Sequence, residues 1–138
     1  MASIDDCRII ELPKIADARG NLTFVENDRH VPFEIKRVFY VYDIPSGQSR
    51  GAHAHHRLSQ FVISLSGSLD VEMDDGKRQR VVHLNRPWLG LLIPPMIWAA
   101  EGNFDPGSVY VVLVDALYDA TDYIRDRDAF LQLARSAT

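Results

Sequence analysis

The sequence is poor in the features that mark several large classes of protein. It has a single cysteine, Cys7, which excludes an internal disulfide and any zinc module built from several cysteines. No apolar run approaches the roughly 18–20 residues that a membrane-spanning helix needs. Residues 1–8 also lack the hydrophobic segment of a signal peptide. We therefore expect a cytoplasmic protein that does not interact with a membrane.

An excess of positive charge is also absent. Fifteen Lys and Arg residues stand against nineteen Asp and Glu residues, which gives a formal net charge of −4. This balance argues against nucleic acid as a partner, because a phosphate backbone requires a basic surface. A small anionic ligand held by two or three arginines is still compatible with it. With 138 residues, of which 46% are hydrophobic, the chain has the size and composition of one globular domain covering residues 1–138.

Most of the chain consists of short segments rich in β-branched and aromatic residues, a composition typical of β-strands. Turn-forming residues separate them, and Asp75-Gly76 between two such segments indicates a hairpin. Only the C-terminal segment has the apolar spacing of a helix, with Thr121 or Asp122 as its N-cap. These features predict an all-β sandwich or small barrel with a short C-terminal helix. The expected strands are residues 22–26, 35–42, 60–65, 68–73, 80–84, 90–93 and 109–115.

Three of the five histidines lie within four residues, at positions 53, 55 and 56. In an extended segment, the side chains of His53 and His55 point to one face and that of His56 to the other. Two imidazoles on one face indicate a functional site. A solvent-facing pair at a sheet edge is the alternative.

The spacing around this pair resembles the first motif of the cupin family of barrels. Gly47 is followed after five residues by His53-x-His55, and Gln60 comes four residues later. In metal-binding cupins, Gln60 is usually replaced by Glu, and a second motif supplies a histidine where this sequence has Ala99. Two histidines and a glutamine are a poor ligand set for a catalytic transition metal. The resemblance therefore implies a cupin barrel without a metal, whose histidines are available for acid–base chemistry.

Further motifs follow one another in order along nearly the whole chain. They are Asp17–Leu22 (DARGNL), Pro32–Tyr40 (PFEIKRVFY), Arg50–His55 (RGAHAH), Leu65–Ser68 (LSGS), Asp74–Gly76 (DDG), Pro95–Trp98 (PMIW) and Tyr118–Asp126 (YDATDYIRD). The ordered set resembles the sugar nucleotide 3,4-ketoisomerases that act on dTDP-4-keto-6-deoxyglucose. The resemblance implies a double-stranded β-helix, also called a jelly roll, that forms a homodimer and needs no metal or other cofactor.

The reaction implied by the resemblance moves a keto group from C4 to C3 of a dTDP-linked hexose through an enediol. Aminotransferases then convert such 3-keto sugars into amino sugars for surface polysaccharides or antibiotics. The resemblance makes His53 the catalytic base that removes the C3 proton. It gives His55 the role of orienting the sugar or relaying a proton. Arg19 would stabilise the charge that develops on oxygen.

The same resemblance gives four residues contacts with the substrate. Arg50 is expected to contact the diphosphate, because a guanidinium can donate two hydrogen bonds to phosphate oxygens. Gln60 would donate to a hydroxyl or carbonyl group, and Trp98 would cover the sugar or the base. Phe39 would line the site at a position where family members usually carry a tyrosine.

Two departures from the family pattern leave alternatives open. Phe39 lacks the tyrosine hydroxyl, and the adjacent Tyr40 should point to the opposite face of its strand. After Trp98 the family commonly has x-Glu-Met, whereas here Ala100 occupies the position of that glutamate. A catalytically weak nucleotide-sugar-binding cupin, a metal-dependent cupin such as a dioxygenase, and a related epimerase are therefore alternative functions. The configuration of the product at C4 also stays open.

Overall fold

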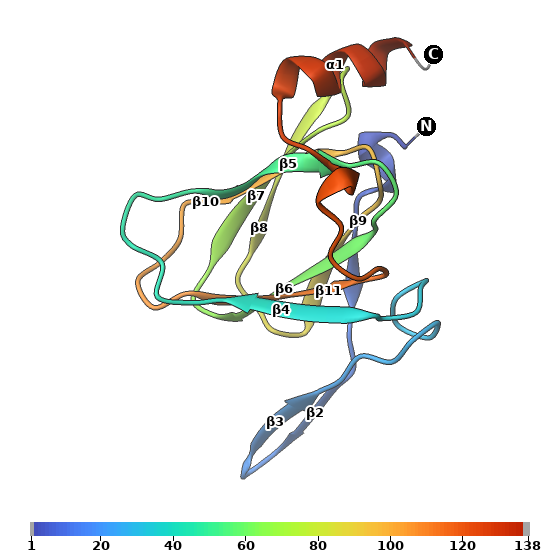
Figure 1. Ribbon diagram of the computed structural model, residues 1–138. Coiled ribbons are helices and arrows are strands. Elements are labelled where there is room, and N and C mark those ends of the chain that lie inside the picture. The colour runs from blue at the N-terminus through green and yellow to red at the C-terminus, as the bar shows by residue number, and fades with distance from the viewer. Residues whose placement is uncertain (1, 137–138) are drawn as a thin grey trace.

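The computed structural model describes residues 2–136, which form two five-stranded sheets and a separate two-stranded hairpin (Figure 1). The first sheet has the strand order β1-β9-β6-β11-β4, the second has the order β12-β5-β10-β7-β8, and β2 and β3 form the hairpin. The strands are β1 (Arg8–Glu11), β2 (Lys14–Asp17), β3 (Gly20–Thr23), β4 (Arg37–Val41), β5 (Arg50–His55), β6 (Gln60–Ser66), β7 (Leu69–Asp74), β8 (Gln79–Leu84), β9 (Leu89–Ile93), β10 (Trp98–Gly102), β11 (Val109–Val114) and β12 (Tyr123–Ile124). The helical segments are η1 (Ile4–Asp6), η2 (Ala120–Asp122) and α1 (Arg127–Ser136).

The inner faces of the two large sheets form the main hydrophobic core. In β7, Leu69, Val71 and Met73 are buried, whereas Glu72 between them is exposed, as the two-residue period of a strand requires. Buried residues of β6, β9 and β11 complete this core from the other sheet. The arrangement confirms the predicted fold class, an all-β cupin double-stranded β-helix with a short C-terminal helix.

Strands β1, β2 and β10 are among those that lie outside the strand segments predicted from the sequence. They have four or five residues each, and β10 (WAAEG) contains a single residue that favours strands. This segment is extended because it pairs with a strand on each side. β10 lies between β5 and β7, and Ala99 is opposite both His53 and Met73. This central position places β10 beside the histidine pair.

The C-terminal helix begins later than the sequence predicts. Helix α1 starts at Arg127, and the Asp126 carboxylate accepts a hydrogen bond from the backbone N–H of Asp128 at 3.3 Å. The predicted N-cap at Thr121 or Asp122 is wrong, because both residues belong to the 3₁₀ turn η2. Strand β12 then follows and pairs with β5. Across residues 2–136, no helix combines the length and the apolar character needed to cross a membrane.

Candidate active site

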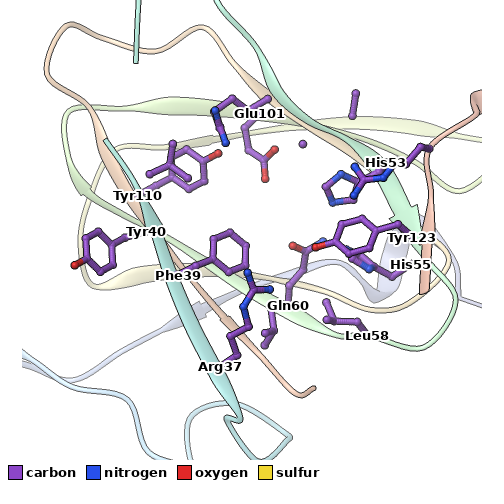
Figure 2. A pocket seen from close by; sticks show the side chains of 16 residues that line it. Arg37, Phe39, Tyr40, His53, His55, Leu58, Gln60, Glu101, Tyr110 and Tyr123 are labelled. Carbon is purple, nitrogen blue, oxygen red and sulfur yellow. The ribbon is translucent and has the colours of Figure 1, made fainter. Parts of the chain in front are cut away.

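A cavity of about 430 Å³ lies between the two large sheets (Figure 2). Its volume is in the range of sites that bind small molecules. Side chains from β4, β5, β6, β10 and β11 line it, together with residues of the segment around β12. The lining residues that carry polar or aromatic groups are Arg37, Phe39, Tyr40, Arg50, His53, His55, Gln60, Glu101, Tyr110, Tyr123 and Arg125.

His53 and His55 both line this cavity, as their shared strand face predicts. Their ring centroids are 4.9 Å apart, and the ring of Tyr123 lies 4.9 Å from His53 and 4.4 Å from His55. Burial lowers the pKa of His53 to about 4, with smaller contributions from His55 and Arg125. His53 is therefore uncharged at neutral pH and has a free nitrogen lone pair, which is the form that acts as a base.

Asp122 holds His55 in place. Its carboxylate lies 3.2 Å from Nδ1 of His55 and accepts hydrogen bonds from the backbone N–H groups of Arg57 and Leu58 at 2.9 and 3.2 Å. Burial lowers the pKa of His55, and Asp122 opposes that shift. Because Nδ1–H donates to the carboxylate, Nε2 is the nitrogen of His55 that is free to accept a hydrogen bond. From the sequence, Asp122 was expected to cap a helix, so this positioning role was missed.

Three arginines give the cavity a positive character. Arg50, expected from the sequence as a phosphate contact, lines it together with Arg37 and Arg125. The Arg37 guanidinium lies 4.8 Å from the centre of the Phe39 ring, and that of Arg125 lies 4.3 Å from the centre of the Tyr123 ring. Arg37 and Arg125 lie in segments far apart in the sequence, which is why the sequence did not reveal them. Three guanidinium groups around one cavity suit an anionic ligand.

Gln60 and Phe39 are in the cavity, where the sequence analysis expected them. Gln60 is buried at the start of β6 and lies between β9 and β11. In Figure 2, Tyr40 turns away from Phe39 on the opposite side of β4. Tyr40 is 63% exposed, and its ring contacts Tyr42. Tyr40 therefore does not replace the hydroxyl that Phe39 lacks.

Glu101 also points into the cavity, and sequence reasoning missed it (Figure 2). Along β10, Ala99 and Glu101 face inward, whereas Trp98 faces the opposite side of the sheet. Only 6% of Glu101 is exposed, and burial raises the pKa of its carboxyl to about 7. In a strand, side chains three positions apart point to opposite faces, so an outward Trp98 would have indicated an inward Glu101. This signal was not used, because β10 was not recognised as a strand.

Two of the expected site residues lie away from the cavity of their own chain. Arg19 is at the turn of the β2–β3 hairpin, which projects from the barrel (Figure 1), and its side chain is 91% exposed and paired with Asp17 at 2.8 Å. Trp98 is buried on the other side of its sheet, where its ring centre lies 5.8 Å from that of Phe130 in α1. The expectation that Trp98 covers the substrate is wrong, because strand alternation points it outward and α1 covers it.

The side chains near His53 do not form a usual metal-binding set. Within residues 2–136, no three His, Cys, Asp or Glu side chains are grouped so that they could hold a metal ion. Gln60 and Ala99 occupy the two remaining cupin ligand positions, and Ala99 has no donor atom. The donor set therefore fits a catalytic transition metal poorly.

Fold and site together define a class of protein. It is a cupin barrel in which one cavity combines an uncharged imidazole, a second imidazole anchored by a carboxylate, and three guanidinium groups. Such a site is suited to proton transfer on an anionic small molecule.

Comparison with known proteins gives the family. The family model FdtA, described as WxcM-like, C-terminal, matches residues 5–135, and the chain belongs to this family. A relative from Aneurinibacillus thermoaerophilus, named TDP-4-oxo-6-deoxy-alpha-D-glucose-3,4-oxoisomerase, is 40% identical over 89% of this chain and 88% of its own length.

Two solved structures show the same similarity. The WlaRB TDP-quinovose 3,4-ketoisomerase from Campylobacter jejuni is 46% identical, with a TM-score of 0.89 over 94% of this chain and 99% of that chain. A mutant of the 3,4-ketoisomerase QdtA from Thermoanaerobacterium thermosaccharolyticum, in complex with TDP-4-keto-6-deoxyglucose, is 34% identical, with a TM-score of 0.94 over 97% of both chains.

Proposed function

We propose that this protein is a TDP-sugar 3,4-ketoisomerase that moves the keto group of a TDP-4-keto-6-deoxyhexose from C4 to C3. The observation that carries the proposal is the buried, uncharged His53 inside a cavity lined by three arginines. Membership of the family and the names of the relatives supply the reaction class. In this function, His53 is the base and Arg37, Arg50 and Arg125 are candidates to bind the diphosphate.

The chemistry needs a base that works on carbon. The proton on C3 is acidified by the neighbouring C4 ketone, and the lone pair of His53 removes it to give an enediolate, which becomes the enediol when O4 is protonated. The same imidazole, now protonated, returns the proton to C4. His55 accepts a hydrogen bond at Nε2 from a sugar hydroxyl, because Asp122 engages its other nitrogen. Gln60 donates to a hydroxyl or to the carbonyl oxygen.

We further propose a homodimer in which Arg19 of one chain reaches the cavity of the other. The β2–β3 hairpin carries Arg19 away from its own barrel, and it exposes Ile15 and Leu22, each at 56%. Val38 and Leu65, on β4 and β6, are also exposed, at 54% and 50%. A second copy of the chain would cover these apolar side chains and would bring a guanidinium to each cavity.

The remaining expectations belong to the same proposal. Residues 1–138 would act as one domain, in the cytoplasm, without a metal or other cofactor. Its product, a TDP-3-keto-6-deoxyhexose, would be consumed by an aminotransferase in the biosynthesis of amino sugars for polysaccharides.

The direct test is incubation of the purified, EDTA-treated protein with TDP-4-keto-6-deoxyglucose, followed by ¹H NMR. We expect a 3-keto product and a stabilising thermal shift with TDP. TDP binding without turnover would replace the isomerase with a binding protein, and deuterium uptake without keto migration would indicate an epimerase. Activity that disappears with EDTA and returns with Fe, Mn, Ni or Zn would indicate a metal-dependent cupin.

Mixing two inactive variants tests the homodimer. If Arg19 acts in the partner's cavity, a dimer of Arg19→Ala with His53→Asn has one site that contains both residues. We expect the mixture, after subunit exchange, to regain activity that neither variant has alone. A monomer by light scattering, or a mixture that stays inactive, would contradict the proposed arrangement.

A further inference from the structure

Glu101 is a buried, chemically reactive group in the cavity for which the reaction above gives no role. Among the buried side-chain nitrogen and oxygen atoms of residues 2–136, Oε2 of Glu101 is alone in having no hydrogen-bond partner. An unsatisfied buried carboxyl oxygen costs free energy, so it needs an explanation. A ligand in the cavity would supply the missing partner.

The backbone of β5 makes room for this carboxyl. Gly51 has a φ angle of +70°, and a β-carbon built at this position would overlap Oε2 of Glu101. The Glu101 carboxyl therefore lies directly against β5, two positions before His53. Same-face positions on a strand are separated by about 6.6 Å, a distance that one sugar ring can bridge. Figure 2 shows the carboxyl and the His53 imidazole pointing into the same cavity.

The cavity lacks the hydroxyl that family members usually have at the position of Phe39. A second proton donor and acceptor is nevertheless needed, because His53 works on the carbon atoms and the two oxygens must also exchange a proton. Tyr110 lies beside Glu101, but burial raises its pKa further above the usual range, so its hydroxyl stays protonated. Glu101 is thus the carboxyl in this part of the cavity that can both give and take a proton.

We propose that Glu101 is a second catalytic residue, which transfers the proton between the C4 and C3 oxygens of the substrate. This inference rests on the proposed ketoisomerase function. It assigns the oxygen chemistry to Glu101 and the carbon chemistry to His53.

The two steps balance as follows. His53 removes the C3 proton, the electron pair forms the C3–C4 double bond, and O4 takes the proton of the Glu101 carboxyl. The enediol then faces an imidazolium and a carboxylate. Glu101 removes the proton from O3 as the C3 carbonyl forms, and His53 returns its proton to C4. Both residues end in the protonation state in which they began.

The electrostatic setting of Glu101 suits this task. Burial raises the pKa of its carboxyl to about 7, and the nearby Arg50 partly opposes that shift. A group that titrates close to the working pH exchanges protons efficiently in both directions. Arg50 and Tyr110 are the charged or titratable neighbours that interact electrostatically with Glu101.

The decisive experiment compares Glu101→Gln with the matched control Glu72→Gln. Glu72 lies on the adjacent strand β7, opposite Ala100, and is exposed outside the cavity. We expect Glu101→Gln to lower kcat about 10²-fold while TDP still binds, as measured by calorimetry. Glu72→Gln should retain the wild-type kcat. Adding Phe39→Tyr to Glu101→Gln should recover at least part of the lost rate.

Glu101→Leu covers the case in which the glutamine variant does not fold, because leucine removes the unsatisfied carboxyl and fills the space. It should fold, bind TDP and be as slow as Glu101→Gln. A wild-type protein that isomerises the substrate together with a Glu101→Leu or Glu101→Gln variant of equal kcat would overturn this inference alone. A wild-type protein that binds TDP but never isomerises the sugar would overturn the proposed function, and this inference with it.

Discussion

The two ends of strand β5 border the same cavity, yet their neighbouring carboxyl groups are in opposite situations. At the His55 end, Asp122 is 5% exposed and accepts hydrogen bonds from His55, Arg57 and Leu58. At the Gly51 end, Glu101 is 6% exposed and one of its oxygens has no partner. Nearly equal burial thus coexists with very different hydrogen bonding.

The difference separates two functions of a buried carboxyl group. Three hydrogen-bond donors fix the position of Asp122, so its carboxylate can orient the His55 imidazole. The incompletely bonded Glu101 keeps a raised pKa and can change its protonation state. The comparison assigns positioning to the Asp122 end and proton transfer to the Glu101 end, with His53 between them.

The largest expected effect comes from His53, which both ends serve. His53→Asn keeps a polar side chain of similar size but removes the base. We expect a loss of at least about 10³-fold in kcat, within the range that a general base contributes, with TDP affinity little changed. Proton NMR of the sugar and calorimetry with TDP are the two measurements. Substantial turnover by this variant would mean that neither end of β5 acts through His53.

Asp122→Asn tests the positioning end. The amide cannot accept from His55 Nδ1–H as a charged group, and it presents an NH₂ group toward backbone donors. We expect kcat to fall about 10²-fold, the lower end for one acid–base group, together with a lower melting temperature. Nitrogen-15 NMR of the His55 ring should report a changed tautomer.

A matched control is Asp119→Asn, in the same segment, where Asp119 is exposed and caps η2. It should affect stability slightly and leave the His55 tautomer unchanged. Full activity and the original His55 tautomer in Asp122→Asn would contradict the positioning function that we assign to Asp122.

The His55 end was largely accessible from the sequence, and the reason is local. The two-residue period of a strand places His53 and His55 on one face whatever the rest of the chain does. The same period predicted that Tyr40 would point away from Phe39, as it does. The β-branched and aromatic content of segments such as 68–73 likewise predicted an all-β fold. Local backbone geometry fixes each of these features.

The Glu101 end could not be predicted, because it depends on long-range pairing. Strand β10 has little intrinsic strand propensity, and its place between β5 and β7 determines that Glu101 faces inward. Asp122 lies 67 positions after His55 and was mistaken for a helix cap, because Asp also favours that position. Arg19 and Trp98 were expected in the cavity, but a projecting hairpin and an outward strand face hold them elsewhere.

The dependence of kcat/KM on pH should show the titration of groups at both ends of β5 in one curve. The active form has His53 neutral, which holds above about pH 4, and Glu101 protonated, which holds below about pH 7. The pKa of His55 is lowered too, so it contributes to the acid limb. We expect kcat/KM to fall about tenfold per pH unit above this window and at least about tenfold per pH unit below it, where two histidines become protonated. Glu101→Gln should keep the acid limb and lose the alkaline limb near pH 7. An alkaline limb that persists in that variant would belong to another group.

Protein stability offers the smallest but most direct comparison, because it needs no substrate. The pKa of Glu101 is about 7 in the folded protein against an ordinary value of 4.5, so between these values the folded state binds more protons than the unfolded state. Stability due to this residue is therefore present at low pH and is lost as the pH rises from about 4.5 to 7, by at most about 1.4 kcal/mol per pH unit. The contribution of His53 to stability changes in the opposite direction. Its pKa falls from 6.5 to about 4 on folding, so its contribution to the unfolding free energy rises with pH over this range.

Subtracting the unfolding free energy of wild type from that of Glu101→Gln cancels the contribution of His53, which both proteins share. This difference should shift in favour of the variant from pH 4.5 to 7. The same difference for Glu72→Gln should stay flat, and parallel curves for both variants would mean that Glu101 is ionised throughout and is no proton donor.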